Sequence, residues 1–414
     1  MIRPLYSLLV IGAQPLLRRK LRRRGVAEPG YLEHVEERFG RYQHAAQSGR
    51  LWIHAVSLGE TRAAAILLEA LRRAQPDLRV LLTHGTATGR AEGRRLLREG
   101  DAQAWLPWDT PQAVQRFLAH FRPSCGVLME TEVWPNLAAA CLARGVPLVL
   151  ANARLSPKSM AQARRFSRLA RPAYGALRAV WAQTEDDARR LASVGASVQG
   201  VFGNLKFDAA PDPLLLQMGR DWRSTSTRPV VMFASSREGE EVEFLRAIAG
   251  VQGIQWLLVP RHPQRFDEVA GLVAQAGRSV SRRGAWDGVP EPADVWLGDS
   301  LGEMPLYYAL ADAALLGGSF APLGGQNLIE AAACGCPVVM GPHTFNFSEA
   351  AELALQAGAA RRAGTMGEGV RTAVELVRDP PARTAAARAG ERFAAAHRGA
   401  AAKTAQAVLA LIER

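Results

Sequence analysis

The sequence predicts two α/β domains, each built as a doubly wound parallel sheet. The first observation is a series of apolar runs, each followed by a stretch with helical patterning. Continuous rather than alternating apolar character is typical of parallel strands that helices cover on both faces. The second is that this rhythm breaks at residues 207–229, which are rich in Pro, Asp, Ser and Thr, and then restarts. With 414 residues, 48% hydrophobic and 22% charged, the chain is long enough for two cores of about 200 residues each.

Ten apolar runs are expected to form strands, five on each side of the break. In the first half they are LWIHAV (51–56), LRVLLT (78–83), CGVLM (125–129), VPLVLAN (146–152) and AVWAQ (179–183). In the second half they are PVVMFAS (229–235), IQWLLVP (254–260), DVWLG (294–298), DAALLGG (312–318) and CPVVMG (336–341). We therefore predict a first domain over residues 25–207, a linker over 208–228, and a second domain over 229–414 that ends in alanine-rich helices. The carboxyl ends of the strands are expected to face a common cleft.

Residues 1–24 form a segment of their own, in which an apolar run precedes a basic cluster. They carry seven basic side chains and no acid, which leaves +5 of the net charge of +12 spread over the rest of the chain. One helical face of the 14-residue run collects apolar and small residues, namely Leu5, Leu8, Leu9, Gly12, Ala13 and Leu16.

The length and polarity of this segment separate the possible membrane roles. The run is shorter than the roughly 20 residues that span a bilayer, and most of its charge follows it, unlike that of a secretory signal. We predict an uncleaved helix that lies on an anionic membrane surface. The alternative is an ordinary first helix with a solvated basic tail.

Composition argues against several other kinds of site. Nucleic-acid binding is not expected, because the remaining charge forms no stripe of basic and aromatic side chains. The four cysteines lack paired metal-ligand spacing and are expected to be buried and reduced. The eight histidines do not cluster and no Asp-X-Asp motif is present, so we expect no metal and no other cofactor.

The loops after the predicted strands hold the candidate functional side chains of the first domain. In METEVWPN, Glu130 and Glu132 follow the strand at 125–129, although the pair alone also fits two acids at a helix N-terminus. In SLGET, Ser57 and Gly59 open a helix whose amides could approach an anion or a sugar. A tight turn with a Ser cap explains SLGET equally well.

A glycine-rich stretch in the second domain predicts a phosphate site. FAPLGGQNLIEAAACG follows the strand at 312–318, and Gly324 and Gly325 would let the backbone approach a ligand. A helix expected to begin near Gln326 would point its amides at this place. Glu330, one turn inside, could accept hydrogen bonds from ribose hydroxyls, whereas close packing of helix and strand is the alternative explanation of the glycines.

Nine motifs occur in an order that resembles the Kdo transferases, which move 3-deoxy-D-manno-octulosonic acid (Kdo) from CMP-Kdo to the lipid A precursor. They are EERFG, SLGET, METEVWPN, ANARLS, GNLKFD, VPRHPQRF, GDSLGEM, GGQNLIEAAACG and MGPHTFNF. The resemblance runs from about residue 4 to beyond residue 350, and METEVWPN and MGPHTFNF are its most specific motifs. It implies the GT-B architecture, with two Rossmann-like halves around a cleft for donor and acceptor, and a membrane-facing N-terminal helix.

The resemblance also implies roles for acidic residues. In the GERxG motif of the family a glutamate is the general base that deprotonates the acceptor hydroxyl, and Glu37 occupies that position. Glu36 replaces the family glycine, and we expect its side chain to point to solvent. Glu130 is the better candidate for a second functional acid, with Glu132 orienting it or capping the helix that begins near Trp134. The residues expected to support the acceptor side are Arg38, Ser57, Gly59, Glu60 and Glu132.

The donor side needs positive charge and amide donors, because CMP departs as an anion. By resemblance, Lys206 takes part in catalysis and Arg261 binds the donor. The residues expected to bind CMP or to border it are Pro260, Arg261, Gly302, Glu303, Met304, Gly324, Gly325, Asn327, Leu328, Ile329 and Glu330. No metal ligand is expected among them.

Together these features imply an inverting glycosyltransferase of lipopolysaccharide core biosynthesis. The expected donor is CMP-Kdo, and the expected acceptor is the lipid A precursor, lipid IVA. The expected place is the cytoplasmic face of the bacterial inner membrane, on an anionic membrane surface. Two alternatives are a GT-B transferase that uses a UDP- or ADP-sugar and a non-enzymatic binder of membranes or nucleic acid.

Overall fold

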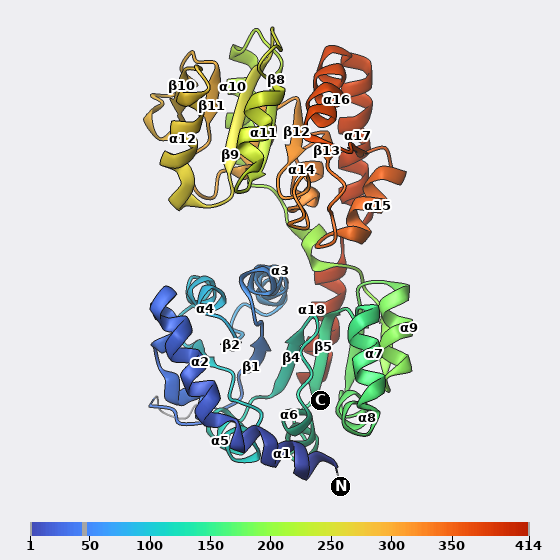
Figure 1. Ribbon diagram of the computed structural model, residues 1–414. Helices are drawn as coiled ribbons and strands as arrows, with labels where there is room; N and C mark the ends of the chain where they lie inside the picture. The colour runs from blue at the N-terminus through green and yellow to red at the C-terminus, as the bar shows by residue number, and fades with distance from the viewer. Residues whose placement is uncertain (1, 44–47, 413–414) are drawn as a thin grey trace. The chain divides into compact units, whose positions relative to one another are not determined.

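The computed structural model describes residues 2–43 and 48–412, which form two compact units (Figure 1). The first unit comprises Met1–Asp208 together with Arg398–Arg414, and the second comprises Ala209–His397. The predicted second domain ran to residue 414, whereas the last helix, α18 (Ala400–Ile412), belongs to the first unit. It packs against α3 (Leu58–Ala74) and β4 (Cys125–Met129), and the Val408 side chain is fully buried there.

The first unit is built on a seven-stranded parallel sheet with the order β3-β2-β1-β4-β5-β6-β7. Its other strands are β1 (Leu51–His54), β2 (Val80–His84), β3 (Ala102–Trp105), β5 (Leu148–Ala153), β6 (Ala179–Ala182) and β7 (Val198–Val201). Its other helices are α1 (Ile2–Gly12), α2 (Gln14–Ala27), α4 (Ala87–Arg94), α5 (Pro111–Phe121), α6 (Pro135–Ala143), α7 (Pro157–Arg165), α8 (Ser167–Gly175) and α9 (Glu185–Ser193). Short 3-10 turns are η1 (Pro29–Leu32), η2 (Val35–Phe39) and η3 (Leu205–Asp208).

Buried side chains cover both faces of this sheet, as the continuous apolar runs predicted. Along β1, Trp52 joins the core under α5, α6, α8 and α9, while Ile53 joins the core under α3 and α18. Ile53 pairs in register with Leu82 on one side and Val127 on the other. Successive residues of a strand point to opposite faces, so a strand covered on both sides must be apolar at every position.

The second unit repeats this architecture with the strand order β10-β11-β9-β8-β12-β13-β14, all parallel. The strands are β8 (Val230–Ser236), β9 (Gln255–Pro260), β10 (Val280–Arg282), β11 (Val295–Leu297), β12 (Ala313–Leu316), β13 (Val338–Met340) and β14 (Ala360–Arg362). The helices are α10 (Pro213–Thr225), α11 (Glu240–Ala247), α12 (Phe266–Gln275), α13 (Met304–Leu310), α14 (Leu328–Ala333), α15 (Ser348–Gln356), α16 (Met366–Arg378) and α17 (Pro380–Ala396). The 3-10 turns are η4 (Pro263–Arg265) and η5 (Arg283–Ala285).

The segment predicted as a linker contains a helix of the second unit. α10 packs against α13, and Trp222 is buried. At Gly219 a Cβ atom would lie 2.3 Å from the carbonyl oxygen of Leu306, so a side chain there would block the close approach of the two helices. The Pro and Asp of this segment cap the helix, since Asp212 accepts a hydrogen bond from the N–H of Leu214.

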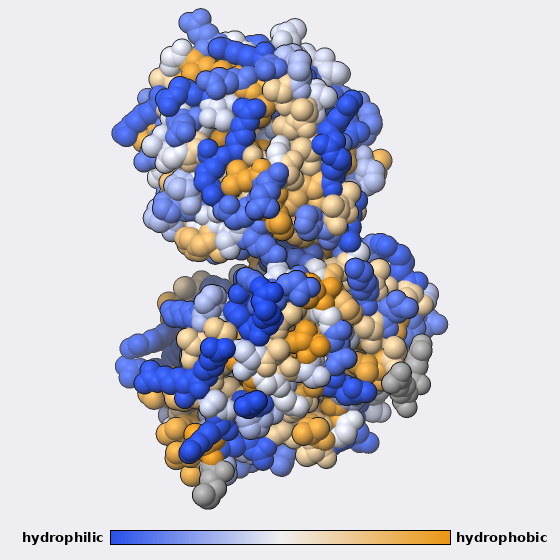
Figure 2. Space-filling model, turned by 90° about the vertical axis from the view of Figure 1, so that its right-hand side faces the viewer, coloured by the Kyte–Doolittle hydropathy of each residue, from blue (hydrophilic) through white to orange (hydrophobic). Residues whose placement is uncertain are grey.

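The N-terminal helix α1 is fastened to the first unit by its polar side chains. The Tyr6 hydroxyl donates to Asp109 over 3.0 Å, and the Ser7 hydroxyl donates to Asn136 over 3.1 Å. The predicted apolar face points outward, and its exposed leucines are Leu5, Leu8, Leu9 and, at the start of α2, Leu16. Hydrophobic surface accordingly gathers at the lower end of the N-terminal unit (Figure 2). No helix among the described residues is both long and apolar enough to cross a bilayer.

Candidate active site

Glu130 stands immediately after β4 in a strained backbone conformation. Its φ is +60°, in the left-handed region, where a non-glycine residue costs about 1–3 kcal/mol. Two backbone hydrogen bonds hold it there, from its N–H to Ala151 O and from the Arg154 N–H to its carbonyl. The neighbouring Asn152 has a φ of +51°. Backbone strain of this kind, here at two adjacent strand ends, is typical of functional sites.

The Glu130 carboxylate is almost fully buried between two cations. Arg154 Nε lies 2.9 Å from Oε2, and Lys206 Nζ lies 3.5 Å from Oε1. The Glu130 side chain is 4% exposed, whereas Lys206 is 26% and Arg154 51% exposed. A buried carboxylate therefore lies beneath two cations that reach solvent. This arrangement brings Glu130 and Lys206, two of the predicted catalytic residues, into one site.

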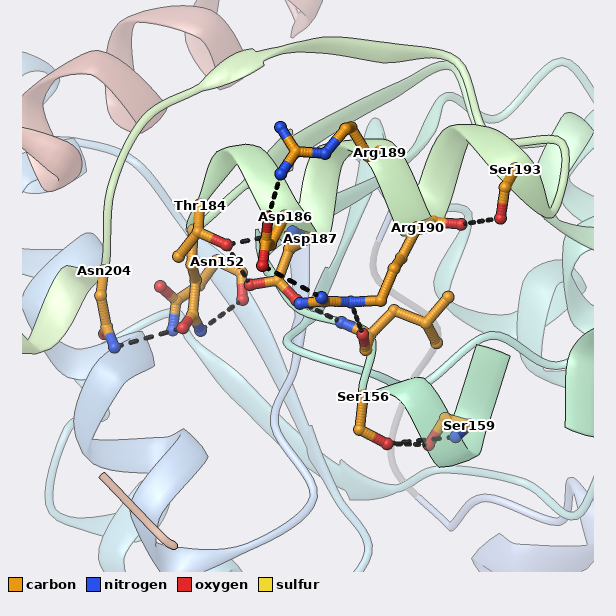
Figure 3. Close-up of polar contacts among 12 residues, drawn as sticks. Asn152, Ser156, Ser159, Thr184, Asp186, Asp187, Arg189, Arg190, Ser193 and Asn204 are labelled. Carbon is orange, nitrogen blue, oxygen red and sulfur yellow. Dashed lines mark hydrogen bonds and ion pairs between the residues drawn. The ribbon is translucent and has the colours of Figure 1, made fainter. Parts of the chain in front are cut away.

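A chain of hydrogen bonds fixes the turn that carries Lys206, and Figure 3 shows the part of it between Asn152 and Asn204. The Leu205 N–H donates to Asn152 Oδ1 over 3.0 Å, and Gln183 Nε2 donates to the Asn152 carbonyl over 2.9 Å. Asn204 Nδ2 then donates to Gln183 Oε1 over 3.2 Å. The Lys206 N–H donates to Asn204 Oδ1 over 3.0 Å. Residues at the carboxyl ends of β5 and β6 thus fix the position of the Lys206 backbone.

Asp187 secures the loop that carries Arg154 in the same view (Figure 3). This nearly buried carboxylate accepts hydrogen bonds from the Leu155 N–H and the Thr184 hydroxyl, both over 2.9 Å. It also accepts from Arg190 over 2.8 Å. Loop and helix α9 are therefore held as one piece, and the Arg154 backbone next to Glu130 is fixed.

Glu60 and Ser57 form a reciprocal cap at the start of α3. The Ser57 hydroxyl accepts from the Glu60 N–H, while the Glu60 carboxylate accepts from the Val56 N–H over 2.8 Å and from the Ser57 hydroxyl over 3.1 Å. Burial raises the pKa of Glu60 to about 7, and the Glu130 carboxylate adds to the shift. Gly59 is exposed, and a Cβ atom there would meet nothing closer than the Ser57 hydroxyl at 4.0 Å. The helix start is open on that side.

The raised pKa of Glu60 gives the stability of the protein a pH dependence. Because the folded-state pKa lies above that of the unfolded chain, the contribution of Glu60 is present in full at acid pH and is lost as the pH rises through 7. Between pH 5 and 8 the wild type is expected to lose about 1–3 kcal/mol relative to Glu60→Gln. Thermal unfolding at both pH values measures this, with the exposed Glu99→Gln as the control. Parallel pH curves for wild type and Glu60→Gln would contradict it.

Glu132 was expected either to orient Glu130 or to cap the following helix, and it does not cap that helix. The N–H groups of Asn136 and Leu137 at the start of α6 donate instead to Asp109, over 2.9 and 2.8 Å. Asp109 lies 27 residues before Asn136, so no local pattern indicated it. Glu132 is partly buried, and burial raises its pKa.

Glu37 lies in η2 with its side chain 4% exposed. Its Oε2 atom accepts from Arg90 over 2.9 Å and from the Trp105 N–H over 2.9 Å. Its Oε1 atom lies 4.0 Å from Nδ1 of His34, a half-exposed residue whose φ is +49°. The guanidinium and the amide fix the plane of the carboxylate.

The neighbours of Glu37 are a buried arginine and an exposed ion-pair cluster. Arg38 lies with its guanidinium carbon 3.8 Å from the centroid of the Trp105 ring and donates to the Gly85 carbonyl over 3.1 Å. Burial lowers the pKa of Arg38 to about 10. Glu36 points outward as expected, but it is paired there, with Arg18 at 2.8 Å and Arg41 at 3.0 Å. The Glu36 charge is therefore matched by cations of its own.

In the second unit, a buried glutamate that the sequence did not single out shapes the glycine-rich loop. Glu240, 2% exposed at the start of α11, accepts four backbone N–H groups. They belong to Arg237, Gly318, Phe320 and Ala321, at 2.7–3.2 Å. The carboxylate therefore organises the loop that leaves β12.

The two paired glycines of this loop adopt the backbone conformation that favours glycine. Gly324 and Gly325 have φ values of +88° and +76°. A Cβ atom at Gly324 would lie 2.4 Å from the Asn346 side chain. The helix α14 begins at Leu328 rather than near Gln326, and its cap is Asn327, which accepts from the Ile329 N–H over 3.1 Å. Glu330 lies in the first turn of α14, next to the buried side chains of Leu328 and Ile329.

The remaining predicted donor residues follow two neighbouring strands. Arg261 comes directly after Pro260, the last residue of β9, and its N–H donates to the Ser236 carbonyl over 3.0 Å. Glu303 occupies the N-cap position of α13 without a capping hydrogen bond from its side chain, which pairs with Arg283 at 2.9 Å, next to Gly302 and Met304. Strand β9 lies between β8 and β11 in the sheet, so these residues share one edge of it. Across residues 2–43 and 48–412, no group of three His, Cys, Asp or Glu side chains could hold a metal ion.

Comparison with known proteins identifies the family. Residues 33–209 match the family described as 3-deoxy-D-manno-octulosonic-acid transferase (kdotransferase). The 3-deoxy-D-manno-octulosonic acid transferase of Bordetella pertussis is 48% identical over 423 residues, covering 98% of each chain. The chain belongs to the Kdo transferase family. The protein of the same name from Haemophilus influenzae is 31% identical and covers 95% of each chain.

Solved structures agree with the predicted architecture. The UDP-GlcNAc 2-epimerase of Neisseria meningitidis aligns with a TM-score of 0.56 at 15% identity, over 88% of this chain and 99% of that one. This likeness shows the fold alone. The predictions of a GT-B fold and of a Kdo transferase family member are confirmed, and the protein is a glycosyltransferase.

Proposed function

We propose that this Kdo transferase family member moves Kdo from CMP-Kdo to the lipid A precursor, in lipopolysaccharide biosynthesis. The observation that carries the proposal is the identity of 48% to the Bordetella pertussis transferase over nearly the whole of both chains. Two buried glutamates with fixed orientation, Glu37 and Glu130, also support the proposal, because the reaction needs a general base and a negative charge near the sugar. A UDP-sugar transferase has no need of the EERFG and METEVWPN motifs together.

In the proposed reaction Glu37 takes the proton of the acceptor hydroxyl. The acceptor oxygen forms the new bond at the anomeric carbon of Kdo, and CMP leaves with the electron pair of the broken bond. A single displacement of this kind inverts the configuration. Glu130 stabilises the positive charge that develops on the sugar, while Lys206 and Arg261 offset the negative charge that develops on the leaving phosphate.

The direct test is incubation with CMP-Kdo and a tetraacylated lipid A precursor, followed by mass spectrometry of the lipid. The expected result is lipid carrying one or more added Kdo units. Thermal unfolding with nucleotides separates the alternative donor class, because a bound ligand raises the midpoint by linkage. CMP and CTP are expected to raise it and UDP is not. Unmodified lipid, or stabilisation by UDP alone, would contradict the proposal.

We also propose that α1 lies on the cytoplasmic surface of the inner membrane. A helix whose polar side chains fasten it to the protein and whose leucines face outward is suited to a bilayer surface. The exposed basic side chains of α2 would contact anionic head groups, and they are Arg19, Lys20, Arg22, Arg23 and Arg24.

Changing three exposed leucines of α1 is expected to release the protein from vesicles. Because burying one leucine contributes about 1.5–3 kcal/mol, the Leu5→Ser/Leu8→Ser/Leu9→Ser variant should bind at least about 100-fold more weakly. Turnover of acceptor in vesicles should fall far more than turnover of detergent-dispersed acceptor. Co-sedimentation with vesicles measures binding. As a matched pair of single variants, Leu8→Ser is compared with Leu214→Ser; Leu8 is 67% exposed and Leu214 is 80% exposed. Unchanged binding of the triple variant would place the membrane contact elsewhere.

A further inference from the structure

A second basic region lies far from the N-terminus in the sequence. Residues 133–184 contain eight Lys or Arg residues and no Asp or Glu. Residues 1–24 contribute +7 and this stretch +8, so the remaining chain carries −3 of the total +12. The expectation that the charge outside the N-terminal segment is spread over the chain is therefore wrong.

Most of this charge lies on the hairpin of α7 and α8 and reaches solvent. The exposed basic side chains of the hairpin are Lys158, Arg164, Arg165, Arg168 and Arg171. Within the part of the chain that the structure describes, none of these five makes an ion pair with an acid. On the next helix, by contrast, Arg190 pairs with Asp187 at 2.8 Å. The hairpin thus presents uncompensated positive charge.

The surface of α8 carries a shallow hollow with hydrogen-bond donors. A shallow hollow of about 400 Å³ is lined by Ser167, Arg168, Arg171 and Pro172. Two guanidinium groups and a hydroxyl are donors suited to a phosphate. Phe166, at the junction of α7 and α8, is half-exposed, and the guanidinium carbon of Arg165 lies 5.7 Å from the centroid of its ring.

This basic surface continues the apolar surface of α1. Helix α1 packs against α6 and α8, and its label stands beside theirs at one end of the first unit (Figure 1). In Figure 2 hydrophobic side chains are visible at the lower end of this unit, with hydrophilic side chains among and around them. Stable attachment of a peripheral protein to a bilayer takes two signals, such as an apolar element and a basic patch.

We infer that the α7–α8 hairpin is a second membrane contact, which binds the phosphates of anionic phospholipids next to α1. The inference rests on the proposed function, in that it presumes an enzyme working at a membrane surface. Charge complementarity and continuity with the outward leucines of α1 favour a bilayer over nucleic acid, since a nucleic acid has no use for an exposed apolar helix. Two contacts, on α1 and on α8, fix the orientation of the first unit on the bilayer, which one helix alone would leave free to tilt.

The test neutralises the hairpin in the full-length protein. The variant carries Arg164→Gln, Arg165→Gln, Arg168→Gln and Arg171→Gln. A matched control carries the same loss of charge on exposed arginines of the second unit, namely Arg246→Gln, Arg371→Gln, Arg388→Gln and Arg392→Gln. With vesicles containing phosphatidylglycerol at low salt, the hairpin variant should bind at least about 50-fold more weakly than wild type, and the control within about 3-fold.

Activity separates failure of this inference from failure of the proposed function. On detergent-dispersed acceptor the hairpin variant should turn over like wild type, because none of its four arginines is among the residues of the proposed active site. Wild type that adds no Kdo in detergent would refute the function and leave the vesicle-binding result standing. Equal vesicle binding by variant and wild type would overturn the inference. The inference would also be overturned if the hairpin variant lost binding to single-stranded DNA while it still bound vesicles like wild type.

A site-specific probe gives a readout that does not depend on the fold of the multiple variant. The four native cysteines are buried, so a polarity-sensitive dye can be attached to Phe166→Cys alone. Anionic vesicles should shift its emission to the blue, while the same dye on Ser224→Cys, exposed on α10, should not respond. An unresponsive dye at position 166 would also overturn the inference.

Discussion

Glu37→Gln is expected to lower turnover by about 10²–10⁴-fold while CMP binding survives. The amide keeps the shape of the side chain and loses the proton acceptor. Glutamine at this position also leaves the Arg90 guanidinium, 2.9 Å from the present carboxylate, without its charge partner in a buried place. Breaking such a pair costs about 3–5 kcal/mol. A loss of stability must therefore be separated from a loss of chemistry.

The double variant Glu37→Gln/Arg90→Gln makes that separation. It removes both buried charges, so thermal stability should recover toward that of the wild type while turnover stays low. Glu36→Gln is the matched control on the adjacent, half-exposed residue and should retain turnover. Near-normal turnover of the Glu37→Gln variant would contradict the assignment of Glu37 as the general base. If Glu60→Gln were then inactive, the role would pass to Glu60, whose pKa of about 7 suits a base.

Removing Lys206 or Arg261, the cations proposed to stabilise the leaving phosphate, is expected to reduce kcat more than it raises KM for CMP-Kdo. Lys206→Ala and Arg261→Ala should each lower kcat by about 10²–10³-fold, because CMP-Kdo has one phosphate and its charge grows as the bond breaks. Steady-state kinetics with varied CMP-Kdo measures both constants. Lys403→Ala, an exposed lysine on α18, is the control and should leave both unchanged.

Glu330→Ala is expected to show the opposite pattern, an effect on KM rather than on kcat. A carboxylate that contacts only the ribose makes the same contact before and during bond breaking, so its loss should raise KM and spare kcat. A pure KM effect for both Lys206→Ala and Arg261→Ala would mean that these cations attract the donor without stabilising the departing phosphate. Another group would then have to take that role.

The strands that sequence patterning found and missed follow a physical rule. All ten predicted runs contain strands, and the four missed strands, β3, β7, β10 and β14, are the edges of the two sheets. Their sequences are AQAW, VQGV, VSR and ARR. An edge strand has one neighbour and less apolar cover, so it need not be apolar throughout, and periodicity does not detect it.

Some site residues could be placed from the sequence, whereas their partners could not. The position of Glu130 follows from its strand, because a polar residue directly after a buried run must lie at the carboxyl end of the sheet. Its partner Lys206 lies 76 residues on, and the partner of Glu37 lies 53 residues on, so only the folded chain brings them together. Three of the four amide partners of Glu240 are about 80 residues away, and no local pattern distinguishes it from a solvated acid.

The return of α18 to the first unit makes the second unit an insertion between two neighbouring points of the chain. Asp208, the last residue before the insertion, accepts hydrogen bonds from the N–H groups of Gly399 and Ala401, so exit and re-entry lie side by side. A gene that ends after the second Rossmann-like fold would remove α18, a partly buried helix of the first unit. A gene that joins Asp208 to Arg398 through a short spacer would instead remove the second unit and keep α18 in the first. The chain thus leaves and re-enters the first unit at two adjacent points, and the second units of relatives could be exchanged between these points.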